Sequence, residues 1–180
     1  MVCNCCIKVI SQDLNKLNLK IKSIKLGEIL IEFNTHILKE NEIEKTLENN
    51  GFEIIKDKEK IIVEQIKTSV IELVHQANYN NSIIRNSDYL VEKLEMPYQQ
   101  LTSIFSKYED ATLEKFIIKH KIEKVKELIE YDELTLSEIA FQMGYSSVQY
   151  LSTQFKTITG YSVSEYKNLP DKERMPLDLI

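Results

Sequence analysis

Cysteine, glycine and proline are all scarce in this sequence, and each scarcity limits what the chain can be. The only three cysteines, Cys3, Cys5 and Cys6, crowd the amino terminus. There they cannot cross-link distant elements as the disulfide framework of a secreted protein does, so they favour a reducing compartment. The four Gly and three Pro residues are so sparse that the segments have to be recognised from hydrophobic periodicity.

Long apolar runs are also missing. No stretch approaches the roughly 18 apolar residues that span a bilayer, and the first ten residues lack the charged-then-apolar pattern of a secretory signal. These absences predict a cytoplasmic protein without a membrane partner. The histidines, at positions 36, 75 and 120, lie far apart with no Asp or Ser constellation around them. We therefore expect no enzyme active site.

Positive charge is in deficit. The chain has 23 Lys and Arg against 28 Asp and Glu, a net charge of -5 and a pI near 5.4. This balance excludes a generally polycationic nucleic-acid coat protein, although it leaves room for a local basic face. With 43% hydrophobic residues, the 180 residues can form one large or two small domains with real cores, and we expect two.

The periodicity of residues 1–56 predicts a small α+β domain. Apolar residues recur at helical spacing from Ile7 to Leu17, and then alternate on both sides of Leu26-Gly27-Glu28, as in a β-hairpin. A second helix is expected over Asn41 to Asn49, followed by a strand at Phe52, Ile54 and Ile55. The order helix, strand, strand, helix, strand matches an incomplete ferredoxin-like unit whose first strand is missing.

The opening MVCNCC resembles the M-x-C-x-x-C loop of heavy-metal-associated domains. The resemblance places Cys3 and Cys6 at the two ligand positions, and implies Cu(I) or another soft metal ion as the ligand. The strand that precedes this loop in the family is absent, and Cys5 adds a third thiol, so either the start of the chain has been clipped or the site has decayed. The alternative is that the cysteines are inert or easily oxidised remnants.

Residues 57–81 are expected to connect the two domains. A helical pattern from Asp57 to Gln76 has a broad apolar face, which must be covered. Packing on the sheet of the first domain and pairing with a second chain in a homodimer are the two alternatives. The polar stretch Asn78 to Ser82 is the expected linker.

The second half of the chain contains two similar segments, FQMGYSSVQYLSTQF (141–155) and VEKLEMPYQQLTSIF (91–105). Leu101 and Phe105 occupy the places of Leu151 and Phe155, and one residue is missing from the earlier turn. A long helix from about Thr112 to Glu130 joins the two copies. This arrangement predicts an all-α domain with a bipartite helix-turn-helix.

Capping boxes mark two of the helix starts. Thr135 with Glu138 is expected to begin the helix Leu136 to Met143, and Ser162 with Glu165 a later one. The segment TLSEIAFQMGYSSVQYLSTQFKTITGYSVSEYK closely resembles the signature of the AraC/XylS family of bacterial transcription regulators. The resemblance covers residues 82–169 and leaves 170–180 as a tail. It implies a transcription regulator that binds double-stranded DNA with both recognition helices in successive major grooves.

The resemblance also implies which residues contact DNA. They are Gln99, Gln100, Thr102, Ser103 and Lys107 in the first unit, and Ser147, Val148, Gln149, Ser152, Thr153 and Lys156 in the second. Gln can bond adenine in a bidentate way, and Ser or Thr can bond bases or phosphates. Gln149 also lies three residues after Ser146, so a role in a capping box is an equal alternative.

Residues 80–180 contain 12 Lys and Arg against 16 Asp and Glu, whereas DNA-binding domains are usually basic. Lys115, Lys119 and Lys126 recur along the connecting helix and could supply a few phosphate contacts. We therefore expect weak DNA binding with a shallow salt dependence. The alternatives are a protein-interaction module with a degenerate helix-turn-helix pair and, from Cys3 and Cys6 alone, a metallochaperone.

Overall fold

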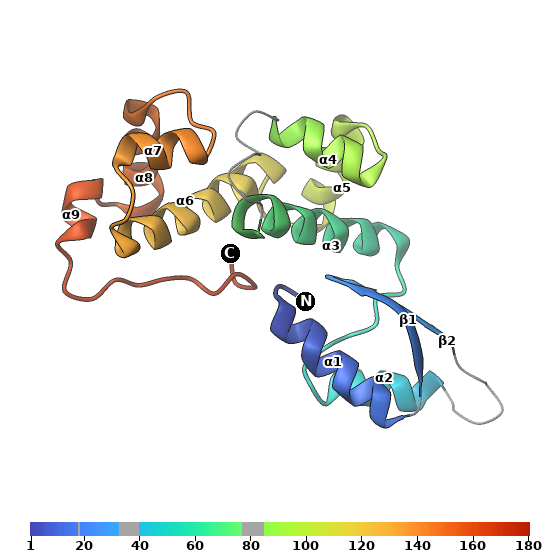
Figure 1. The fold of residues 1–180 in the computed structure, drawn as a ribbon. Coiled ribbons are helices and arrows are strands. Elements are labelled where there is room, and N and C mark those ends of the chain that lie inside the picture. Colours follow the sequence, from blue (N-terminus) through green and yellow to red (C-terminus); the bar gives the residue numbers. More distant parts are fainter. Residues whose placement is uncertain (18, 33–39, 77–84) are drawn as a thin grey trace. The chain divides into compact units, whose positions relative to one another are not determined.

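The computed structural model describes residues 1–17, 19–32, 40–76 and 85–180, and Figure 1 shows its elements. The expected linker at 78–82 and one histidine, at position 36, lie outside the described residues. The chain divides into two compact units, residues 1–68 and 69–180. The division falls inside helix α3 (Lys58–Ile71), within residues 57–81, which the sequence assigned to the connection between two domains.

The first unit combines helices with a β-hairpin, as the periodicity predicted. Before α3 its elements are α1 (Asn4–Lys16), β1 (Lys20–Lys25), β2 (Glu28–Glu32) and α2 (Glu40–Glu48). Its core is built on four buried residues, Ile10, Leu14, Leu19 and Ile43. Apolar residues of both strands pack against this core, which accounts for their alternation in the sequence.

The hairpin has two details that shape the first unit. Gly27 has a φ of +78°, a left-handed conformation that costs glycine no steric energy. The strands β1 and β2 pair antiparallel with a register shift between Ile21 and Ser23. Because a bulge of this kind shifts the alternation by one residue, both Ile21 and Ile24 pack against the core.

The third strand expected at Phe52 to Ile55 is not formed, and the described sheet has two strands. Helix α2 ends in a Schellman-type turn, in which the Phe52 amide donates to the Leu47 carbonyl (3.0 Å) and the Gly51 amide to that of Glu48 (2.9 Å). Phe52 then packs against the core as a single side chain. The structure confirms helices with a small antiparallel sheet, but not the ferredoxin-like assignment.

In the part of the second unit that the structure describes, every regular element is a helix, and an irregular tail follows the last one. After the end of α3 its elements are the π-helix η1 (Glu72–Gln76) and the helices α4 (Asn86–Leu94), α5 (Tyr98–Tyr108), α6 (Leu113–Tyr131), α7 (Leu136–Gln142), α8 (Val148–Thr159) and α9 (Val163–Lys167). No described helix combines the length and the hydropathy needed to cross a bilayer.

The two helix-turn-helix units repeat with the same core. The pairs 101/151, 105/155, 113/163 and 116/166, each fifty residues apart, are all buried. Phe105 of α5 packs on Phe116 with ring centroids 5.2 Å apart. Phe155 of α8 packs on Tyr166, with ring centroids 5.4 Å apart. Each unit therefore anchors its second helix to an aromatic ring on the helix that follows it.

Both expected capping boxes are confirmed. Thr135 and Ser162 each form a complete capping box, and the Thr112 hydroxyl accepts from the Lys115 amide at 3.3 Å. Gly144, with a φ of +68°, follows the end of α7. These caps satisfy amide and carbonyl groups that a helix end leaves open, so the polar residues between the apolar stripes fix where each helix begins and ends.

Candidate nucleic-acid interface

Helices α5 and α8 occupy the recognition positions of the two helix-turn-helix units. Their buried stripes are Leu101 with Phe105 and Leu151 with Phe155. The side chains predicted to contact DNA lie off these stripes, and each is exposed or partly exposed: Gln99, Gln100, Thr102, Ser103 and Lys107, and Ser147, Val148, Gln149, Ser152, Thr153 and Lys156. Each helix therefore presents hydrogen-bonding groups to solvent.

The amino-terminal end of α8 separates two roles that the sequence left open for Gln149. The N-cap of α8 is Ser147, whose hydroxyl accepts from the Tyr150 amide at 3.1 Å. Ser146 lies before this cap, so the capping box of Ser146 with Gln149 is not formed. The Gln149 side chain is exposed and is not committed to the helix start.

The two threonines predicted to contact DNA are hydrogen-bonded to the main chain of their own helices. The Thr102 hydroxyl donates to the Gln99 carbonyl and that of Thr153 to the Gln149 carbonyl, both at 2.9 Å. A hydroxyl has one hydrogen and two lone pairs. In this arrangement each threonine has only acceptor capacity left, which suits a partner with an amino group.

The first helix-turn-helix differs from the second at its recognition helix. Pro97, the N-cap of α5, supplies no side-chain cap. An open hollow beside α5 is lined by Tyr98, Gln99, Thr102, Ser103 and Lys107 together with Ser106, Thr112 and Glu114. The Tyr98 hydroxyl donates to the Glu114 carboxylate at 3.1 Å, and burial, then this carboxylate, raises the pKa of Tyr98 to about 12. An acidic group thus borders the first reading surface.

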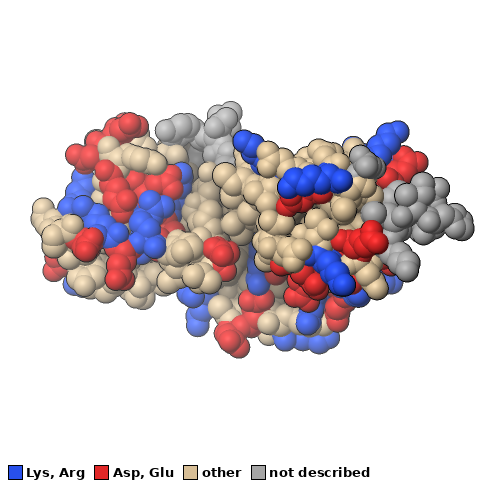
Figure 2. All heavy atoms as spheres, turned by 90° about the horizontal axis from the view of Figure 1, so that it is seen from below, with Lys and Arg blue, Asp and Glu red and all other residues tan. Residues whose placement is uncertain are grey.

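Many basic residues of the second unit are committed to acidic partners. Lys93, Lys124, Lys126, Lys167 and Arg174 all form ion pairs. Lys126, expected as a phosphate contact, instead lies 2.5 Å from Glu123 and is only 14% exposed. Lys115, Lys119 and Lys156, which were also expected to contact phosphates, are exposed and make no ion pair with any described residue. Figure 2 shows one face on which basic and acidic side chains are interspersed.

Two residues that hold elements of the second unit together were not predicted from the sequence. Lys121 of α6 donates to the Met143 carbonyl at 2.8 Å, and burial lowers its pKa. Arg174 of the tail binds carboxylates on α6. Both contacts join residues more than twenty positions apart, so local periodicity has no signal for them.

The amino-terminal cysteines lie in the first unit, at the start of α1. The Sγ atoms of Cys3 and Cys6 are 3.7 Å apart and partly buried, whereas Cys5 is exposed. The described residues contain no group of three or more His, Cys, Asp or Glu side chains that could hold a metal ion. Cys3 and Cys6 therefore place two thiols close together at the start of α1.

Comparison with known protein families identifies the second unit. Residues 90–168 match a family described as a helix-turn-helix domain, and this stretch includes α5 and α8, the second helices of the two helix-turn-helix pairs. It is an AraC-like helix-turn-helix domain, the type found in DNA-binding regulators, so that part of the predicted resemblance is confirmed. The heavy-metal-associated resemblance of the first unit is not confirmed. Comparisons of the chain with curated proteins and with solved structures gave no match.

Proposed function

We propose that this protein is a sequence-specific transcription regulator that reads two half-sites in successive major grooves, one with α5 and one with α8. The observation that carries the proposal is the fifty-residue repeat. Equivalent positions are buried in both units, and the exposed positions between them hold Gln, Ser and Thr. These side chains hydrogen-bond base edges and phosphates.

Helix α6 supports the proposed spacing of the two readers. It has 19 residues, and at a rise of ~1.5 Å per residue it is roughly 28 Å long. Major grooves on one face of DNA recur every ~34 Å. A continuous helix of this length can hold two recognition helices close to one helical turn apart.

We propose that the second helix-turn-helix makes the stronger contacts with DNA. Gln149 is exposed and uncommitted, and a Gln amide can bond adenine through both N6 and N7. Ser147 accepts the Tyr150 amide, which leaves its hydroxyl hydrogen for a phosphate oxygen at the positive end of α8. In the first unit Glu114 borders the reading surface, and its negative charge opposes a phosphate backbone.

The test is selection from a randomised duplex pool at low salt, with wild type and Gln149→Ala in parallel. We expect two short motifs about one helical turn apart, and the mutation should relax one base pair of one motif by ~1–3 kcal/mol. Gln154→Ala is the matched control. It removes the same amide from the same helix, where that amide donates to the Tyr150 hydroxyl at 3.1 Å.

The pool experiment has two results that contradict the proposal. If the wild-type protein enriches no motif, the proposal of sequence-specific DNA binding is wrong, and binding of a protein partner is the alternative. Equal relaxation in Gln149→Ala and Gln154→Ala would show that Gln149 acts through the helix and not through a base. Electrophoretic mobility shifts with the recovered duplex, at three salt concentrations, separate these results from nonspecific binding.

We propose as a second function that Cys3 and Cys6 bind a soft metal ion. Their Sγ atoms lie 3.7 Å apart at the start of α1, and two sulfur ligands are a donor set for a soft, low-coordinate ion. A bound ion such as Cu(I) would supply charge and would link the N-cap residue Cys3 to Cys6 in the first turn of α1. Titration with Cu(I) against a competing chelator tests this proposal. Binding should survive Cys5→Ser and vanish in Cys3→Ser, and loss in both variants would contradict the assignment.

A further inference from the structure

Three glutamates form an acidic row along helix α6. Glu123, Glu127 and Glu130 are spaced four and three residues apart, which places them on one face of a helix. Glu123 is only 6% exposed. Like charges at these spacings repel each other, and a buried carboxylate is costly without a partner. The row therefore requires a cation, and two neighbouring lysines contact only part of it.

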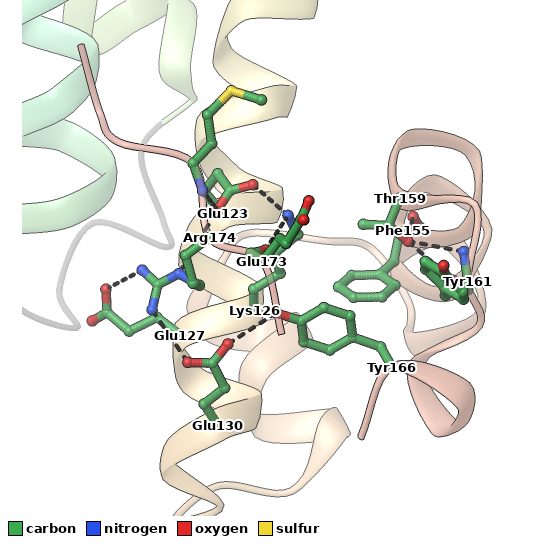
Figure 3. Close-up of polar contacts among 11 residues, drawn as sticks. Glu123, Lys126, Glu127, Glu130, Phe155, Thr159, Tyr161, Tyr166, Glu173 and Arg174 are labelled. Carbon is green, nitrogen blue, oxygen red and sulfur yellow. Dashed lines mark hydrogen bonds and ion pairs between the residues drawn. The ribbon is translucent and has the colours of Figure 1, made fainter. Parts of the chain in front are cut away.

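Arg174 of the C-terminal tail contacts all three carboxylates at once. Its Nε lies 3.7 Å from Glu123, its Nη2 3.1 Å from Glu127 and its Nη1 3.6 Å from Glu130. Figure 3 shows the guanidinium pointing into the row from the tail. A guanidinium presents several donors in a fixed plane, so one side chain can bridge acidic groups over two turns of α6.

The main chain on both sides of Arg174 is held as well. The Met175 amide donates to a Glu123 carboxylate oxygen at 3.2 Å, and the Lys126 ammonium donates to the Glu173 carbonyl at 3.3 Å. Three consecutive residues, 173–175, are thus bound to α6. We call residues 169–180 the C-terminal strap.

The acidic row also contacts the second reading unit. A Glu130 oxygen accepts from the Tyr166 hydroxyl of α9 at 2.9 Å. The Tyr166 ring packs on Phe155 of α8, with centroids 5.4 Å apart. Figure 3 shows this series of contacts, from Arg174 through Glu130 and Tyr166 to Phe155. The strap, the connecting helix and the second recognition helix therefore share one continuous set of contacts.

We infer that Arg174 is a positioning residue for DNA reading: by binding the acidic row, the C-terminal strap fixes the orientation of α8 and α9 on α6 and so sets which half-site spacing the protein accepts. The inference rests on the proposed function. Two rigidly linked readers bind a correctly spaced pair of sites with a high effective concentration, and this advantage is lost when the geometry does not fit. A loosened second unit should bind each half-site normally but tolerate several spacings.

The experiment uses the full chain and a duplex library in which the two selected half-sites are separated by spacers of varied length. Arg174→Gln is compared with Lys172→Gln, which removes a tail cation that makes no ion pair with any described residue. Wild type should prefer its best spacing over one that is two base pairs longer by at least about tenfold. In Arg174→Gln this preference should fall to about threefold or less, while affinity for a duplex with the second half-site alone stays within about twofold.

Further measurements separate positioning from a general loss of stability. Arg174→Lys should give an intermediate spacing preference, because one ammonium cannot span three carboxylates. Amide hydrogen exchange of α9 should become faster in Arg174→Gln, with that of α4 unchanged. An unchanged spacing preference in Arg174→Gln would overturn the inference and leave the proposed function intact. If wild type selects no half-sites, the proposed function fails and the inference fails with it, whatever the exchange data show.

Discussion

The Lys121 ammonium on α6 lies 2.8 Å from the main-chain carbonyl oxygen of Met143, the residue that ends α7. The same ammonium lies 5.5 Å from the centre of the Tyr145 ring. A single side chain of the connecting helix thus satisfies the end of α7 and covers the turn that leads to α8. This contact anchors the second helix-turn-helix to the helix that joins both units.

Lys121→Met should lower the free energy of unfolding by about 1.5–3 kcal/mol, the range for hydrogen bonds that involve a charged group. The Met side chain retains most of the apolar stem, so the loss reports the ammonium. Urea unfolding at pH 7 measures the change. Lys119→Met is the control, because Lys119 is exposed and unpaired among the described residues, and it should change the value by less than about 0.5 kcal/mol. Equal effects of both variants would contradict the anchoring role.

A buried histidine pair makes stability depend on pH. His75 Nε2 of η1 lies 3.2 Å from His120 Nδ1 of α6, and this bond requires at least one ring nitrogen to accept. Burial, then Lys124, lowers the pKa of His75 to about 4, against the raising effect of Glu127 and with a further lowering by Arg174. Burial, then His75 and Lys119, lowers the pKa of His120 to about 3.

The sign of the pH effect follows from these directions. In the unfolded chain both histidines bind a proton near pH 6.5, well above their folded pKa values, so the unfolded state holds more protons in between. The free energy of unfolding should therefore fall as the pH drops from about 6.5 towards about 4, by up to about 1.4 kcal/mol per pH unit for each histidine. Urea unfolding at pH 7, 6 and 5 measures it.

The matched variant for the pH effect is His75→Asn, which should remove about half of the slope between pH 6.5 and 5. The capping glutamates, Glu138 and Glu165, have pKa values lowered from 4.5 by their caps, so they titrate below this window. A slope that is identical in wild type and His75→Asn would show that the histidine pair is not its source.

Much of the fold could be predicted because short-range sequence patterns determine it. Caps and apolar stripes placed the helix ends of the second unit, and alternation around Leu26 and Gly27 placed the hairpin. The prediction of a third strand at Phe52 to Ile55 was wrong for a physical reason. The apolar residues near Phe52 can form a strand only if an edge is available, and instead the amide of Phe52 completes the end of α2. A single sequence does not show which of these partners an amide takes.

The candidate site could be predicted only in part. The exposure of Gln149 and the other readers follows from helical periodicity, since they lie off the stripe of Leu151 and Phe155. Lys126 was assigned to phosphate contacts, yet it is bound to Glu123. The roles of Lys121 and Arg174 depend on contacts across 22 and more than 40 residues, and no periodic pattern records such distances.

The turn between α4 and α5 contains a residue in an unfavourable backbone conformation. Glu95 ends α4 with a φ of +52° and a ψ of +33°, the left-handed region that costs most residues about 1–2 kcal/mol. Gly144 has the equivalent role after α7. Glu95→Gly should therefore raise the free energy of unfolding by roughly 0.5–1 kcal/mol. Glu92→Gly, inside α4, should lower it by about 1 kcal/mol, so the same exchange has opposite signs at two nearby positions.

The last prediction concerns the salt dependence of DNA binding. Lys115, Lys119 and Lys156 are exposed and unpaired among the described residues, whereas Lys93, Lys124, Lys126, Lys167 and Arg174 are bound to carboxylates. With three or four phosphate contacts, log affinity against log salt should have a slope of about -3 to -4, shallower than the roughly -5 expected for six contacts. Fluorescence anisotropy of a labelled duplex between 50 and 200 mM salt, roughly the range over which such slopes are resolved, measures it.

Lys156→Gln should reduce the slope by about 1, and Lys167→Gln should leave it unchanged because Lys167 is paired with Asp132 at 2.7 Å. Equal slopes for wild type and Lys156→Gln would place the phosphate contacts elsewhere on the chain.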